Sequence, residues 1–174
     1  MKKIVSALFG FIFLFSIHVN ATEKLSIEKQ LVGVVGAISG TVKTETRELK
    51  AGDQIYLNET IYAGPGSGTQ ILLLDQSTFT VGEDSEVVMD TFVFDPETND
   101  GKIVASVKQG SLKVISGLIS KKNPDSLTVE VPEGTLGSRG TEFQTIVSKG
   151  KTDTLLIGPG TVSYTHLTLP TSTH

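Results

Sequence analysis

Short runs of β-branched and apolar residues recur along this chain, separated by glycine, aspartate, proline and serine at intervals of roughly 8–12 residues. From Leu31 onward, no window keeps an apolar period of about 3.6 residues over three helical turns. This spacing predicts an all-β single domain, folded as a twisted β-solenoid-like roll or as a sandwich. There is no strict internal repeat of the kind that defines a regular solenoid. The sequence therefore leaves the closure undecided between a roll and a sandwich.

Several turns can be placed from composition. Turns are expected at Gly52-Asp53, over 63–68 and over 82–85, and a break at Gln109-Gly110. Between them, residues 69–74 carry apolar side chains at both odd and even positions. This pattern predicts a central strand that is buried on both faces.

The N-terminus has the three parts of a secretory signal peptide. Lys2 and Lys3 precede an apolar stretch over 4–17, and small residues lead up to Ala21. We expect a Sec-type signal peptide at 1–21, cleaved after Ala21, and a periplasmic or secreted protein without later membrane insertion. An uncleaved membrane anchor is the alternative, although the apolar stretch is short for a spanning helix. Residues 22–48 are interpreted as an N-terminal lead-in with the first strands.

The last twelve residues, 163–174, differ in style from the rest of the chain. They are similar to the translated sequencing-adapter tail found on metagenomic open reading frames, and we predict that they are non-native. An ordinary disordered tail is the alternative. The β domain itself is therefore expected over 49–162.

Charge and side-chain chemistry exclude several functions. Without Lys2 and Lys3, 13 basic residues (15 − 2) face 19 acidic ones, a net charge of −6 (13 − 19), which argues against binding to nucleic acid. The chain has no cysteine, and its histidines are His18, His166 and His174. The region 22–162 therefore lacks the usual general base and thiol nucleophile, and we expect neither an enzyme nor a cofactor.

Acidic residues beside turns are the remaining candidates for chemistry. Asp95, Glu97 and Asp100 form a weak calcium candidate in the loop 95–101, which lacks EF-hand spacing. A solvated hairpin loop that caps itself is the favoured interpretation. Five further carboxylates lie beside turn residues, and we expect turn caps rather than a paired active site there: Asp53, Asp75, Asp84, Glu86 and Glu142.

A glycine-spaced segment follows the strand expected at 127–131. Its motif residues are Gly134, Gly137, Arg139, Gly140, Thr141 and Phe143. The regular glycines predict a tight structural corner rather than an uninterrupted strand. Arg139 either donates to carbonyls or a carboxylate within that corner, or binds an acidic ligand in an exposed groove; we favour the structural role.

The order of these features resembles the FecR domain family, named after the iron-citrate signalling regulator of bacterial envelopes. The elements that carry the resemblance are Gly52-Asp53, 63–67, 71–77, 82–85, 107–110, 131–134 and Arg139-Gly-Thr-Glu-Phe143. Gln76 departs from the family pattern, which most often has glycine there, and we expect it to tolerate a turn conformation. The signal peptide is followed directly by the domain, unlike the transmembrane regulators of the family. The resemblance therefore implies the fold but not the signalling role.

Together these observations predict a non-catalytic exported module that binds an envelope or surface protein or glycan, in signalling or assembly. The alternatives are a structural or adhesin-like envelope scaffold and, less favoured, a polysaccharide-acting hydrolase. The strands at an unsealed end could pair with a strand of the partner.

Overall fold

The structure, a computed structural model, describes residues 29–139, 142–149, 151–159 and 161–166. Strands dominate this part of the chain, and the prediction of an all-β single domain is confirmed. The strands are β1 (Leu31–Ser39), β2 (Val42–Lys43), β3 (Gln54–Tyr56), β4 (Thr60–Ala63), β5 (Gly68–Leu73), β6 (Thr78–Val81), β7 (Ser85–Phe94), β8 (Gly101–Ile115), β9 (Leu127–Val131), β10 (Gly134–Arg139), β11 (Glu142–Ser148), β12 (Lys151–Leu156) and β13 (Thr161–His166).

The longest strand, β8, belongs to two sheets. Up to Gln109 it pairs with β7 and, in parallel, with β9; from Gly110 onward it pairs with β11 and then also with β6. Gly110 has φ 83°, in the left-handed region that favours glycine. The break predicted at Gln109-Gly110 is therefore a change of sheet within one continuous strand.

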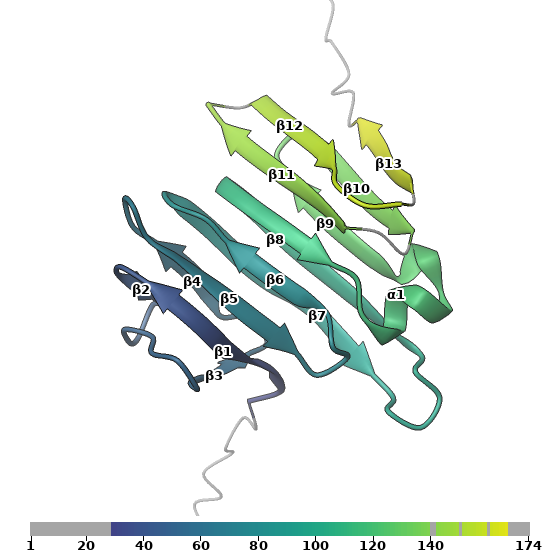
Figure 1. Cartoon of the computed structure of the whole chain (residues 1–174), viewed down its shortest axis with the longest axis horizontal. Helices are drawn as coiled ribbons and strands as arrows, with labels where there is room; N and C mark the ends of the chain where they lie inside the picture. The colour runs from purple at the N-terminus through teal and green to yellow at the C-terminus, as the bar shows by residue number, and fades with distance from the viewer. Residues whose placement is uncertain (1–28, 140–141, 150, 160, 167–174) are drawn as a thin grey trace, which may run out of the picture.

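Two layers result from this change of sheet (Figure 1). The front sheet has the order β3–β1–β5–β6–β8–β11–β12, and the back sheet has the order β2–β4–β7–β8–β9–β10–β13. Strands that precede β8 in sequence lie on one side of it, and strands that follow lie on the other. The architecture is thus a sandwich whose layers are joined through β8, one of the two closures that the sequence left open.

Inward side chains of both sheets form the hydrophobic core. The largest fully buried ones are Phe79, Phe143, Ile55, Ile61, Ile71, Met89, Ile103, Leu112, Ile119, Leu127 and Leu136. Burying one such side chain contributes roughly 1.5–3 kcal/mol relative to leaving it in water. With no disulfide available, this core and the strand ladders carry the stability.

Strand β5 is buried on one face. Ile71 and Leu73 point into the core, whereas Leu72 and Leu74 are 43% and 47% exposed on the outer face of the front sheet. The prediction that both faces are buried is wrong, because apolar residues at consecutive positions do not require a second covering layer.

A short helical segment follows β8. It consists of α1 (Leu118–Lys122) and the 3₁₀-helix η1 (Pro124–Ser126). Ile119 is fully buried and anchors the segment at the end of the sandwich. A five-residue helix is too short to show a helical period in the sequence.

The segment predicted as a corner is a strand. Gly134–Arg139 forms β10, which pairs with β9 on one side and with β13 on the other. The turn lies before it, at Pro132 and Glu133. Regular glycine spacing therefore did not interrupt the strand, and the corner prediction is corrected.

Some predictions concern segments at the two ends of the chain that lie outside the described residues. The expected signal peptide and residues 22–28 lie outside the described residues. Of the predicted non-native tail, residues 163–166 belong to β13 and the remainder lies outside the described part. Among the described residues, no helix has the length and apolar character needed to span a membrane.

Candidate binding cleft between strands β12 and β13

One row of side chains on β12 points towards the interior of the sandwich. This row is only partly covered by other residues. Thr152, Thr154 and Leu156 alternate along β12 and stand opposite buried residues of β11 in the ladder. Directly opposed residues share a face of a sheet, so these three continue the inner face. Leu156 nevertheless keeps 42% of its surface exposed. The inner face of the front sheet thus extends beyond the packed core, and the sandwich is open at this end.

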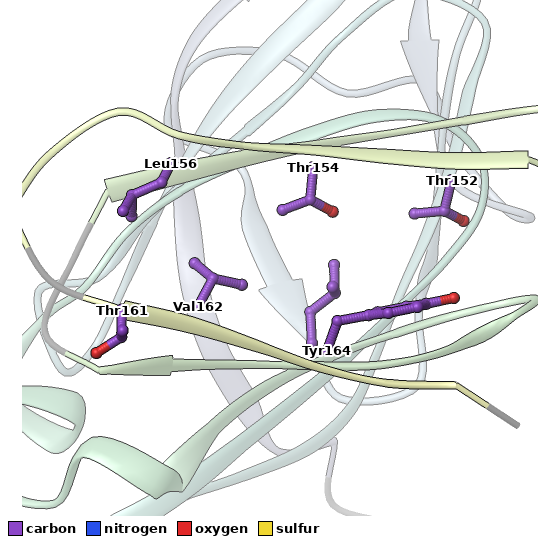
Figure 2. A pocket seen from close by; sticks show the side chains of 7 residues that line it. Thr152, Thr154, Leu156, Thr161, Val162 and Tyr164 are labelled. Atoms are coloured by element: carbon purple, nitrogen blue, oxygen red, sulfur yellow. The ribbon is translucent and has the colours of Figure 1, made fainter.

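A cavity lies between this row and the opposite layer. Figure 2 shows Thr152, Thr154 and Leu156 on β12 across from Val162 and Tyr164 on β13. The cavity has a volume of about 430 Å³, and Leu136 and Thr161 complete its lining. This volume falls in the range of ligand sites. Since Tyr164 belongs to the predicted non-native tail, the residues of β10 and β12 define the cleft for the arguments below.

Thr152 carries an unsatisfied polar atom in this lining. Its Oγ1 is buried and has no hydrogen-bond partner among the described residues. The neighbouring Thr154 Oγ1 donates to Thr145 Oγ1 at 3.4 Å. A buried hydroxyl without a partner costs about 1–3 kcal/mol. A ligand with a donor or acceptor at that point would remove this cost.

The two terminal strands also expose hydrogen-bonding edges. Within the part of the chain that the structure describes, β12 pairs only with β11, and β13 pairs only with β10. At the end of β12, Leu155 and Ile157 are 63% and 44% exposed. A free edge next to exposed apolar side chains is a template on which another strand can pair.

The calcium candidate is a hairpin loop in which two of the three carboxylates already have partners within the protein. Asp95 accepts hydrogen bonds from the backbone N–H of Glu97 (2.9 Å) and from Thr98 Oγ1 (2.8 Å). Asp100 forms an ion pair with Lys122 of α1 at 2.8 Å. The Thr98 and Glu97 hydrogen bonds lower the pKa of Asp95, and the hydrogen bond from Lys122 lowers the pKa of Asp100. Among the described residues, no three His, Cys, Asp or Glu side chains gather as metal ligands.

The buried Asp75 is a structural cap. Both of its oxygens accept hydrogen bonds from Ser77, from the backbone N–H at 3.0 Å and from Oγ at 2.7 Å. Gln76 between them has φ 67°, the left-handed conformation that the family's glycine suggested. Gly117 packs against this corner so closely that a Cβ would lie 2.3 Å from the backbone oxygen of Asp75. The corner thus fixes the end of β8 rather than presenting a reactive carboxylate.

Two of the other carboxylates are likewise bound by neighbours. Asp53 Oδ2 accepts a hydrogen bond from the backbone N–H of Lys50 at 2.8 Å, as expected for a turn cap. Glu142 lies 2.5 Å from Lys113 Nζ on the outer face of the front sheet. Asp84 and Glu86 line a hollow on another part of the surface, described below. The five candidates therefore do not converge on one site.

Strand β10, which lies within the glycine-spaced segment, contributes Leu136 to the wall of the cleft. A Cβ on Gly134 would lie 2.1 Å from the backbone oxygen of Thr165, so β10 needs a glycine where β13 approaches it. Phe143 is fully buried in the core. The backbone of Arg139 belongs to β10, opposite Thr161. Its side chain, and the whole of Gly140 and Thr141, lie outside the described residues.

An ion pair near the other end of the sandwich was not identified from the sequence. Arg47 donates from Nη1 and Nη2 to the two carboxylate oxygens of Glu59, at 3.0 and 3.1 Å. Glu59 is only 8% exposed and also accepts a hydrogen bond from the backbone N–H of Tyr56. Arg47 is one of two arginines in the chain, and this scarcity was the available signal.

Comparison with known proteins assigns the family. A family model described as FecR protein matches residues 59–162, which is more than half of the chain and runs from just before β4 into β13. Neither the curated proteins nor the solved structures gave a match. The resemblance seen over residues 50–147 is thereby confirmed, with Gly52-Asp53 lying before the matched range. The chain belongs to the FecR protein family.

Proposed function

We propose that this chain is an exported, non-catalytic module that binds an extended segment of an envelope protein in the cleft between β12 and β13. The observation that carries the proposal is the uncovered inner face of β12 beside a free strand edge. Membership in a family named after an envelope signalling regulator supports a role in signalling or assembly.

Strand addition explains how such a segment would bind. A partner strand beside β12 gains main-chain hydrogen bonds, which are independent of its sequence. Every second side chain of that strand enters the cavity, where Leu136 and Leu156 offer apolar contact. The unpartnered Thr152 hydroxyl favours a partner strand that places a polar group beside it. The cleft thus selects a partner segment in which apolar and polar side chains alternate.

Export and the absence of catalysis rest on the sequence. The features at 1–21 support a Sec-type signal peptide and a periplasmic or secreted location. The region 22–162 contains neither histidine nor cysteine, which leaves few groups for acid–base or nucleophilic chemistry.

Site-specific photo-crosslinking in cells that export the full chain tests this proposal. A photoreactive residue in place of Thr154 faces the cleft, whereas one in place of Asp153 on the same strand faces outward. We expect a discrete envelope protein to be crosslinked from position 154 and not from 153. Adding Leu156→Asp should abolish the product, because it introduces a charge into the apolar lining. Equal crosslinking from both positions would contradict binding in the cleft.

A further inference from the structure

The outer face of the back sheet carries an aromatic ring among planar polar groups. Lys43 of β2, Tyr62 of β4, Glu86 of β7 and Gln109 of β8 are directly paired across successive ladders. Directly paired residues share a face. Because neighbouring strands lie about 4.8 Å apart, the four positions form a row roughly 14 Å long across the sheet.

A hollow of about 420 Å³ lies along this row. It is lined by all four row residues together with Thr41, Pro65 and Asp84, among others. Its rim is held by hydrogen bonds between turns. Gln109 Nε2 donates to the backbone oxygen of Asp84 at 3.1 Å, and the backbone N–H of Gly66 donates to Glu83 Oε2 at 2.9 Å. The amide of Gln109 is therefore positioned before any ligand arrives.

A second hollow, of about 690 Å³, continues from the first. The two share Asp84 and Gln109 in their linings, and the second one reaches Ser111, Ser148 and Lys149 at the strand ends of the front sheet. Together they form an elongated groove. A ligand of several linked units fits this shape better than one small molecule does.

The chemistry of the groove matches a sugar chain. A sugar ring has an apolar C–H face that packs on an aromatic ring, and hydroxyl groups at its edge that pair with carboxylates and amides. Tyr62 supplies the ring, while Glu86 and Gln109 supply the edge groups from the adjoining strands. Charges of both signs line the two hollows, so the groove favours no ligand that carries one sign of charge along its length; they are Lys43, Lys149, Glu83, Asp84 and Glu86.

We propose that this groove binds an oligosaccharide, with Tyr62 as the stacking platform and Glu86 and Gln109 as hydrogen-bond partners of the sugar hydroxyls. The groove runs from the outer face of the back sheet to the strand ends of the front sheet, and it shares no lining residue with the cleft between β12 and β13. The proposal therefore stands independently of protein binding in that cleft.

NMR titration of the isotope-labelled full chain tests it. The probes are trimers of N-acetylglucosamine, glucose and mannose, each added to about 10 mM, a range that detects millimolar dissociation constants. We expect at least one trimer to shift the backbone resonances around Tyr62, Asp84 and Gln109 saturably. Tyr62→Ala should weaken that binding by about tenfold or more, as for a central aromatic contact. Tyr62→Phe should retain it to within about threefold, because the platform remains.

Controls separate this site from the cleft and from other ligands. Leu156→Asp, which disables the cleft, should leave the sugar titration unchanged, and the thermal midpoint of each variant verifies that it is folded. The proposal is overturned if no trimer shifts these resonances, or if Tyr62→Ala binds as well as the unchanged chain. Tighter binding of a tetralysine peptide at the same resonances would also overturn it, since the groove would then recognise cationic chains.

Discussion

Gly110→Ala should destabilise the domain strongly, because this glycine is where β8 changes from one sheet to the other. An alanine Cβ there would lie 2.1 Å from Ser85 Oγ and 2.4 Å from Ser85 Cα, and φ is 83°. The Ser85 hydroxyl accepts a hydrogen bond from the backbone N–H of Ser111 at 2.9 Å. The substitution therefore combines backbone strain, a steric clash and loss of a hydrogen bond.

The magnitude follows from these three costs. A non-glycine residue in the left-handed region costs about 1–2 kcal/mol, and overpacking costs about 1–3 kcal/mol. A displaced hydrogen bond adds about 1 kcal/mol. We expect Gly110→Ala to lower the free energy of unfolding by roughly 3–6 kcal/mol, a large part of the roughly 5–15 kcal/mol available to a domain.

Two other glycines serve as matched controls in chemical denaturation. Gly52 has φ 89° but open space around its Cβ position, so Gly52→Ala should cost only the backbone strain, about 1 kcal/mol. Gly137 has neither a left-handed φ nor a close neighbour, so Gly137→Ala should change stability by less than about 0.5 kcal/mol. The reasoning is supported if the unfolding free energy is highest for Gly137→Ala, lower for Gly52→Ala and lowest for Gly110→Ala. A loss for Gly110→Ala no larger than that for Gly52→Ala would refute the tight crossing of the two sheets.

Three further predictions concern polar groups. Thr152→Val should raise the thermal midpoint, because it removes a buried hydroxyl without a partner, whose burial costs about 1 kcal/mol of stability. A lowered midpoint would contradict that account. Arg47→Ala should lower the unfolding free energy by about 1–3 kcal/mol. This loss is smaller than for breaking a fully buried pair, because the Arg47 side chain is 32% exposed. Adding Glu59→Gln to the same chain should recover part of the loss. Because the folded-state pKa of Asp95 is lowered, its contribution to stability is present above its ordinary pKa and is lost as the pH falls through the lowered one. Carbon-detected NMR should therefore show Asp95 titrating below its ordinary range, and Thr98→Ala should move that titration back up.

Local turn chemistry explains which parts of the fold could be predicted from the sequence. The turns expected over 63–68 and 82–85 are observed at residues 65–66 and 83–84, because glycine and its polar neighbours mark tight turns between short strands. Gln76 was expected to tolerate a turn conformation where the family most often has glycine, and its φ of 67° agrees with that expectation. Such features depend on a few neighbouring residues, and that information is present in the sequence.

Features that depend on distant pairing could not be predicted in this way. The parallel pairing of β8 with β9 and the passage of β8 through Gly110 are set by the arrangement of whole sheets. Leu72 gave the same signal as a buried leucine although it faces outward. The Arg47–Glu59 pair joins residues on either side of β3, and the cleft arises from strand order rather than from any motif.

The two ends of the sandwich differ in a way that bears on where a partner binds. Before β8, the layers end in the short edge strands β2 and β3, of two and three residues, with the Arg47–Glu59 pair beside them. Short edges offer few free hydrogen-bonding groups. After β8, the front sheet of the described residues ends in the six-residue strand β12, and exposed Leu155, Leu156 and Ile157 extend beyond the core. A partner strand would therefore gain more main-chain bonds and more apolar burial at the C-terminal end, and crosslinking from Gln54 on β3 should be weak compared with crosslinking from Thr154 on β12.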